Sequence, residues 1–112
     1  MSLLWIEQVA IQAKNYHLDL NVNQLWAFAI VCNQEGISAS ELMHHTGMSK
    51  ATASRALRLL ADKVDPAREG YQLIELQHDP KDYRVRRAYL TPLGHQFKQA
   101  LIESTLEEGV AA

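Results

Sequence analysis

A group of cationic and short polar side chains near the middle of the chain carries its clearest chemistry. The group lies in MSKATASRALRLL (48–60) and comprises Ser49, Lys50, Thr52, Ser54, Arg55 and Arg58. Arginine can donate two hydrogen bonds to guanine O6 and N7, and lysine and arginine pair with phosphate oxygens. Short hydroxyl side chains allow a helix to approach base edges closely. We therefore expect Arg55 to contact a base or a phosphate, and Lys50 and Arg58 to contact phosphates; a solvated helix face is the alternative.

A second polar group follows in HDPKDYRVR (78–86) and comprises Lys81, Asp82, Arg84 and Arg86. Arg84 can enter a narrow minor groove, where the negative potential is enhanced. Asp82 is spaced to hold that guanidinium by a charge-assisted hydrogen bond. Lys81, Arg86 and Arg87 are candidates for phosphate contacts, but Arg86 and Arg87 are neighbours on a predicted strand and cannot both face the same way. The alternative is an ordinary turn with a surface ion pair.

Two short helices joined by a tight turn are predicted to position the first group. Ser38 and Glu41 have the spacing of a capping box, which starts a helix. Gly47 favours the left-handed conformation that ends one. Ser49 can cap a second helix, predicted over 49–63. Such a pair is typical of a helix-turn-helix, whose second helix lies in the major groove of DNA.

The remaining elements follow from apolar periodicity, caps and turn residues. The sequence predicts helices over 3–16 and 21–34 before the helix-turn-helix. After it, a loop is predicted over 64–70, strands over 71–77 and 86–90, and a last helix over 92–108. The predicted fold is mainly α with a small β-hairpin wing (α+β), a winged helix-turn-helix in the order α-α-α-α-β-β-α. At 112 residues the chain is expected to form one domain over 1–112, with the wing at 78–87.

The charge is unevenly distributed along the chain. The formal net charge is −2, yet residues 50–87 contain nine of the eleven basic residues and six acids, a balance of +3 against −5 elsewhere. A basic middle between acidic ends favours one DNA-facing surface on an acidic body. Chance clustering is the alternative explanation.

Two motifs carry a resemblance to a known family. One is the segment 48–60, with Ser49, Thr52, Ser54 and Arg55 in register; the other is D-x-x-D-x-R followed by L-T-x-x-G, present as Asp79, Asp82, Arg84, Leu90, Thr91 and Gly94. Over about 20–97 the chain resembles the MarR-type winged-helix transcription regulators. It departs from their pattern at Tyr83, where arginine is frequent, in a longer loop between Lys63 and Tyr71, and in being about one helix shorter after Ile102.

The resemblance implies a homodimeric repressor or activator that binds double-stranded DNA. Its recognition helices would enter adjacent major grooves while the wing arginine probes the minor groove. The terminal helices, 1–18 and 92–108, would form the dimer interface. Many relatives bind a small molecule between that interface and the DNA-binding lobes, but no residue here supports such an effector.

The N-terminal residues favour a dimer independently of the resemblance. Leu3, Leu4, Trp5 and Ile6 form an apolar run that a small monomer could hardly cover, and exposed apolar patches usually mark interfaces. The alternative is a first helix that folds back on its own core.

Several classes of function are not expected. The sequence shows no catalytic constellation, cofactor motif or metal spacing among its five histidines, and no apolar run long enough for a membrane span. The single Cys32 and the lack of a signal peptide predict a cytoplasmic protein. The rival hypothesis is a winged helix that docks a protein partner instead of DNA. A ligand- or redox-gated sensor would add to DNA binding without replacing it.

Overall fold

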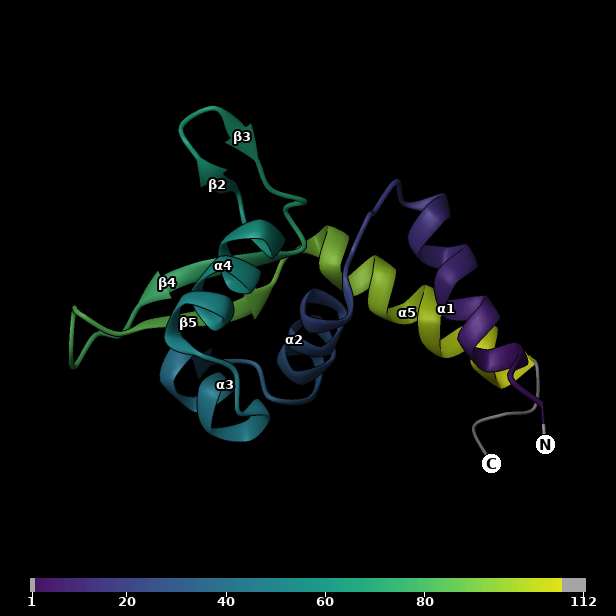
Figure 1. The fold of residues 1–112 in the computed structure, drawn as a ribbon, viewed down its shortest axis with the longest axis horizontal. Helices are drawn as coiled ribbons and strands as arrows, with labels where there is room; N and C mark the ends of the chain where they lie inside the picture. Colours follow the sequence, from purple (N-terminus) through teal and green to yellow (C-terminus); the bar gives the residue numbers. More distant parts are fainter. Residues whose placement is uncertain (1, 108–112) are drawn as a thin grey trace.

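Residues 2–107 are described by the computed structural model, and they form five helices and five short strands (Figure 1). In chain order these are α1 (Leu4–Asn15), α2 (Val22–Asn33), β1 (Ile37–Ser38), α3 (Ala39–Thr46), α4 (Lys50–Leu60), β2 (Lys63–Asp65), β3 (Arg68–Glu69), β4 (Ile74–His78), β5 (Arg86–Leu90) and α5 (Pro92–Glu107). The predicted α+β winged helix-turn-helix is confirmed. The predicted order was incomplete, because β1, β2 and β3 were not anticipated.

Capping boxes set the starts of α2 and α3, and the one at Ser38 was predicted from the sequence. At α2 the Asn21 side chain accepts from the Gln24 amide and the Gln24 side chain from the Asn21 amide, both at 2.9 Å. Ser38 and Glu41 form the same reciprocal pair at the start of α3, at 3.0 and 3.2 Å. Gly47 ends α3 in the left-handed conformation, with φ of 75°. Because these bonds join residues three apart, the sequence alone could specify them.

Helix α4, the second helix of the helix-turn-helix, ends earlier than predicted, at Leu60 instead of Lys63. The returning backbone supplies the reason: the amides of residues 70–73 donate to the carbonyls of residues 59–62 at 2.7–2.9 Å. These tertiary bonds satisfy the end of the helix, so no further helical turn forms. The returning segment can approach the end of α4 closely because residue 70 is glycine. A Cβ at this position would collide with the carbonyl of Ala61.

The segment predicted as a loop over 64–70 is instead a small hairpin of β2 and β3. Its turn is held by the Ala67 amide, which donates to Asp65 Oδ1 at 2.8 Å. The first wing strand was also misplaced: β4 spans Ile74–His78, not 71–77. The second wing strand, 86–90, is confirmed with the predicted bounds. β5 pairs with β4 on one side and with β1 on the other, both antiparallel.

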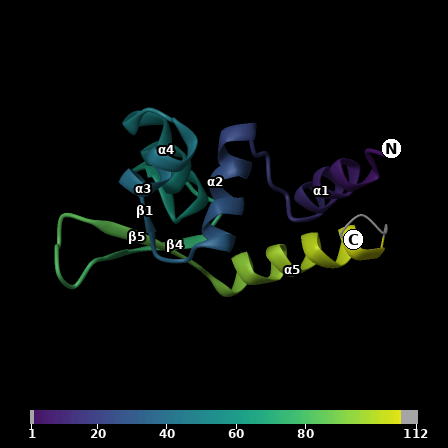
Figure 2. The same ribbon diagram turned by 90° about the horizontal axis from the view of Figure 1, so that it is seen from below.

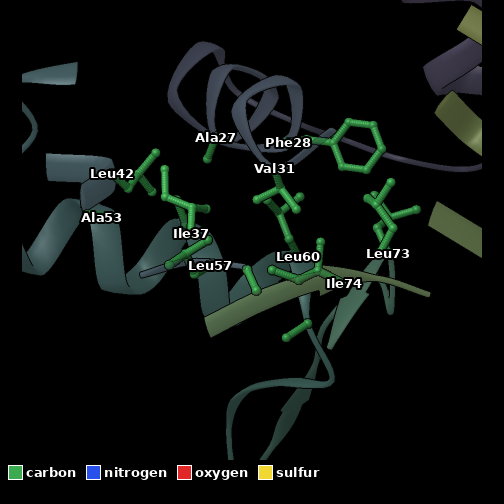
Figure 3. Packing of buried hydrophobic residues seen from close by; sticks show 14 of the residues in the cluster. Ala27, Phe28, Val31, Ile37, Leu42, Ala53, Leu57, Leu60, Leu73 and Ile74 are labelled. Atoms are coloured by element: carbon green, nitrogen blue, oxygen red, sulfur yellow. The ribbon is translucent and has the colours of Figure 1, made fainter. Parts of the chain in front are cut away.

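The hydrophobic core lies between α2, α3, α4 and the sheet. Figure 3 shows Val31 of α2 pointing toward Leu60 of α4, with Ile74 of β4 nearby. Phe28 of α2 and Phe97 of α5 are fully buried and their ring centroids lie 5.2 Å apart. This contact joins α5 to the core that carries the helix-turn-helix.

Helices α1 and α5 lie side by side and extend away from the wing (Figures 1 and 2). Helix α1 therefore does pack on its own chain, but it contains no buried residue. Leu3, Leu4, Trp5 and Ile6 remain 42–65% exposed. Within residues 2–107, no helix has both the length and the apolar content of a membrane span.

Candidate functional site

The outward face of α4 carries the cations that the sequence singled out. Lys50, Arg55 and Arg58 are exposed, whereas Ala53, Ala56, Leu57 and Leu60 face the core. The alanines bring the helix close to α2 and the leucines anchor it, so one side is held by packing and the other is presented to solvent. Helix α4 therefore has one core-facing side and one side that carries exposed cations.

The hydroxyl side chains at the start of α4 also have structural tasks. Ser49 Oγ accepts from the Thr52 amide at 3.2 Å and donates to Thr52 Oγ1 at 3.0 Å. Ser49 is the exposed N-cap, and Thr52 and Ser54 are half-buried. A contact from Ser49 or Thr52 to a ligand would therefore extend an existing hydrogen-bond pair.

A hollow of about 350 Å³ brings α4 and the wing together. Its lining residues come from α3, α4, β4 and β5 and are Ala39, Ser54, Leu57, Arg58, Leu76 and Arg86. Three predicted site residues, Ser54, Arg58 and Arg86, therefore meet at one place although they come from two elements. We call this the wing-side hollow.

A second hollow, of about 290 Å³, lies on the α2 side of the recognition helix. It is lined by Asn21, Asn23, Gln24, Thr52, Arg55 and Ala56. Arg55 extends back along its own helix, and its Nε donates to the Ala51 carbonyl at 3.3 Å. We call this the α2-side hollow. Asn23 and Arg55 are far apart in the chain, so their proximity could not be predicted from the sequence.

The tip of the β4–β5 hairpin holds Arg84 in the predicted pairing. Asp82 accepts from Arg84 Nε at 3.1 Å and from its Nη2 at 3.3 Å, and the arginine side chain is still 91% exposed. Tyr83 stacks on His78 with ring centroids 3.9 Å apart, and His78 Nδ1 lies 2.8 Å from the Tyr83 carbonyl oxygen. Lys81 is exposed on the same tip. The tip is thus ordered by local contacts while its guanidinium remains free to meet a ligand.

Arg87 lies on the face of β5 opposite Arg86, as strand alternation requires, and its side chain is 32% exposed. It donates to Asp79 at 2.8 Å, and to the Gly36 carbonyl and Glu41 both at 2.9 Å. The bond from Arg87, then that from the Lys81 amide, lowers the pKa of Asp79. The Ser38 capping bonds, then Arg87, lower the pKa of Glu41. Arg87 therefore joins the hairpin to the start of α3, a role that sequence reasoning missed because the partners are distant in the chain.

The exposed cations of this surface are largely unneutralised. Within residues 2–107, no ion pair involves Lys50, Arg55, Arg58, Lys81 or Arg86, and Arg84 pairs with Asp82 alone. A surface with unpaired cations on a packed helix and an ordered hairpin favours binding of a polyanion.

Other candidate chemistry is weaker. Burial, more than the neighbouring charges, raises the pKa of the Cys32 thiol to about 11, so little reactive thiolate forms at neutral pH. Among the residues that the structure describes, no cluster of histidine, cysteine and acidic side chains is arranged to hold a metal ion.

The chain was compared with known proteins. No family model and no curated protein matches, whereas many solved structures do. They include a MarR transcriptional regulator from Methanosarcina mazei Go1 (22% identity, TM-score 0.69, 91% of this chain and 66% of that chain). The S. aureus MepR–DNA complex matches at 17% identity and a TM-score of 0.74, over 92% and 77% of the chains. RV1404 from Mycobacterium tuberculosis matches at 20% and 0.73, over 94% and 66%.

These identities are low, so the likeness establishes the fold. The present chain spans about two thirds of the length of two of these three structures. The winged-helix arrangement of a recognition helix beside a β-hairpin is the shared feature.

Proposed function

We propose that this protein is a MarR-like transcriptional regulator that binds double-stranded DNA in a sequence-specific manner. Helix α4 would lie in the major groove, and the tip of the β4–β5 hairpin would reach the minor groove or the backbone. The base and phosphate contacts would come from the predicted residues Ser49, Lys50, Thr52, Ser54, Arg55, Arg58, Lys81, Arg84 and Arg86, with Asp82 orienting Arg84.

One observation carries this proposal: Arg58 of the recognition helix and Arg86 of the hairpin line one hollow. A helix and an arm that converge in this way can hold a duplex along its backbone while the helix reads base edges. The MepR–DNA complex, which has the same fold, supports the choice of DNA as the ligand. The class of function that we propose, transcriptional regulation, is that of the MarR regulator from Methanosarcina mazei Go1, which has the same fold.

We further propose a homodimer through α1 and α5. Large apolar side chains remain exposed along these helices, including Trp5, Ile6, Ile11 and Ile102. A second copy placed on this face would bury them and would present two recognition helices to adjacent major grooves, about one turn of DNA apart. The bound site would then be a pseudo-palindrome.

The test begins with selection of bound duplexes from a random pool, followed by gel shifts on the selected site. Arg55→Ala and Arg84→Ala should each weaken binding, whereas Glu103→Ala on α5 should not. A loss that is equal for all three variants contradicts the proposal. A protein-docking winged helix would select no sequence and would pass through immobilised duplex DNA at low salt.

A further inference from the structure

We infer that the α2-side hollow binds a backbone phosphate on the DNA strand opposite the one that the hairpin approaches, with Asn23 as a contact residue. This inference rests on the proposed function. It adds α2 to the DNA-binding surface and gives the recognition helix a phosphate contact on each flank.

The two hollows lie on opposite flanks of α4. Successive residues of an α-helix are rotated by about 100°. The α4 residues of the wing-side hollow, Ser54, Leu57 and Arg58, therefore lie about 180° around the helix from those of the α2-side hollow, Thr52, Arg55 and Ala56. The exposed Ala51 lies between the two sets on the solvent side.

A helix in the major groove has one sugar-phosphate strand on each side, because the groove is only wide enough for the helix. On one flank of α4, Arg58 and Arg86 line the wing-side hollow and can hold the DNA strand that passes there. The other strand must pass the opposite flank, where the α2-side hollow opens. The α2-side hollow therefore lies where the sugar-phosphate backbone of the second DNA strand passes.

The lining of the α2-side hollow suits a phosphodiester. It contains Arg55 and four neutral polar side chains, and none of its described lining residues is acidic. Asn21 and Gln24 use their side-chain oxygens in the capping box, which leaves their NH₂ groups as donors. Asn23 is exposed and its side chain makes no hydrogen bond within residues 2–107. Amide donors beside one guanidinium match the oxygens and the single charge of a phosphodiester.

The test is Asn23→Asp, which replaces the amide by a carboxylate of the same shape. An acid in the first turn of a helix is stabilising or neutral, so the thermal midpoint should not fall. Affinity for the selected duplex, measured by fluorescence anisotropy at low salt, should fall about tenfold for each chain that binds, or about a hundredfold for a dimer. Each chain then places one like charge about 4 Å from a phosphate. Gln34→Glu makes the same charge change at the exposed C-cap of α2, the opposite end of that helix from Asn23, and should bind as the unmodified protein does.

A second measurement locates the contact. Duplexes with neutral methylphosphonates at two symmetry-related positions, moved stepwise along the site, should reveal one pair at which Asn23→Asp causes no additional loss, because the phosphate charge that repels each carboxylate is gone. In each half-site, that position should lie on the strand opposite the one protected by Arg86.

The outcomes separate the two proposals. If Asn23→Asp binds as tightly as Gln34→Glu while Arg58→Ala is weakened, the phosphate assignment is wrong and the proposed function stands. If no methylphosphonate pair abolishes the effect of Asn23→Asp, the assignment is also wrong. If the unmodified protein selects no duplex, both proposals fail.

Discussion

The salt dependence of DNA binding is the sharpest prediction for the wing-side hollow. The perturbation is the double variant Arg58→Ala/Arg86→Ala, which removes both cations that line it. Lys50, Lys81 and, in the α2-side hollow, Arg55 are the other proposed phosphate contacts of each chain, which makes about ten in a dimer. Since each neutralised phosphate contributes about −0.9 to the slope of log K against log salt, the unmodified dimer should lose roughly 10⁵ in affinity between 50 and 200 mM salt. The double variant should lose only about 10³ over the same range.

The measurement is fluorescence anisotropy on the selected duplex at five or more salt concentrations. The single variants Arg58→Ala and Arg86→Ala should each reduce the slope by about 1.8 per dimer. Lys14→Ala removes one exposed cation from α1 and should leave the slope unchanged. Parallel lines for the double variant and the unmodified protein would refute the reasoning, because they would show that neither arginine displaces counterions from the DNA.

Three further predictions concern the elements that hold the site. Arg87→Met should lower the free energy of unfolding at neutral pH and should reduce the further fall of that free energy below about pH 4. The lowered pKa values of Asp79 and Glu41 stabilise the fold at pH values above the pKa of the same groups in the unfolded chain. This stability is lost as the two carboxylates protonate. Urea unfolding at pH 3–7 checks this, and a variant with the same pH profile as the parent contradicts it. Gly94→Ala should lower the free energy of unfolding by about 1–3 kcal/mol, measured by urea unfolding. The added Cβ would collide with the Leu73 carbonyl, and this cost outweighs the gain of up to about 1 kcal/mol from helix propensity. An unchanged urea midpoint would show that the backbone relaxes freely. Cys32 should react slowly with a thiol reagent at pH 7.5 and faster as the pH rises toward 11; rapid reaction at neutral pH would restore the redox-sensor hypothesis.

The features that the sequence predicted correctly are set by neighbours in the chain. The capping boxes at Asn21 and Ser38 join residues three apart, and Gly47 ends α3 by its own backbone conformation. The second wing strand was found because it is a short run ending at the Thr91–Pro92 helix start, and the Thr91 hydroxyl does accept from the Gly94 amide at 3.0 Å. The Asp82–Arg84 pair needed only a spacing of two.

The features that could not be predicted depend on distant parts of the chain. The end of α4 is set by amides that return from residues 70–73. β1 is only two residues long and exists because Ile37 and Ser38 pair with β5. Arg87 and Asn23 were missed for the same reason: their surroundings come from Glu41 and Gly36 in one case and from α4 in the other. Short-range patterns carry no information on such contacts.

The proposed DNA contacts and the residues that hold the wing in place are different residues. Arg55, Arg58 and Arg84 are exposed, and apart from the Asp82 pair they contribute little to packing. The hairpin is instead fixed by β-pairing and by Arg87, whose three partners lie in the α2–β1 turn, in α3 and at the hairpin itself. Substitution on the outward face of α4 therefore costs little folding free energy, since surface changes away from buried networks are usually nearly neutral. Loss of Arg87 would move the wing relative to the helix, and it should weaken binding to every duplex without changing which bases are preferred.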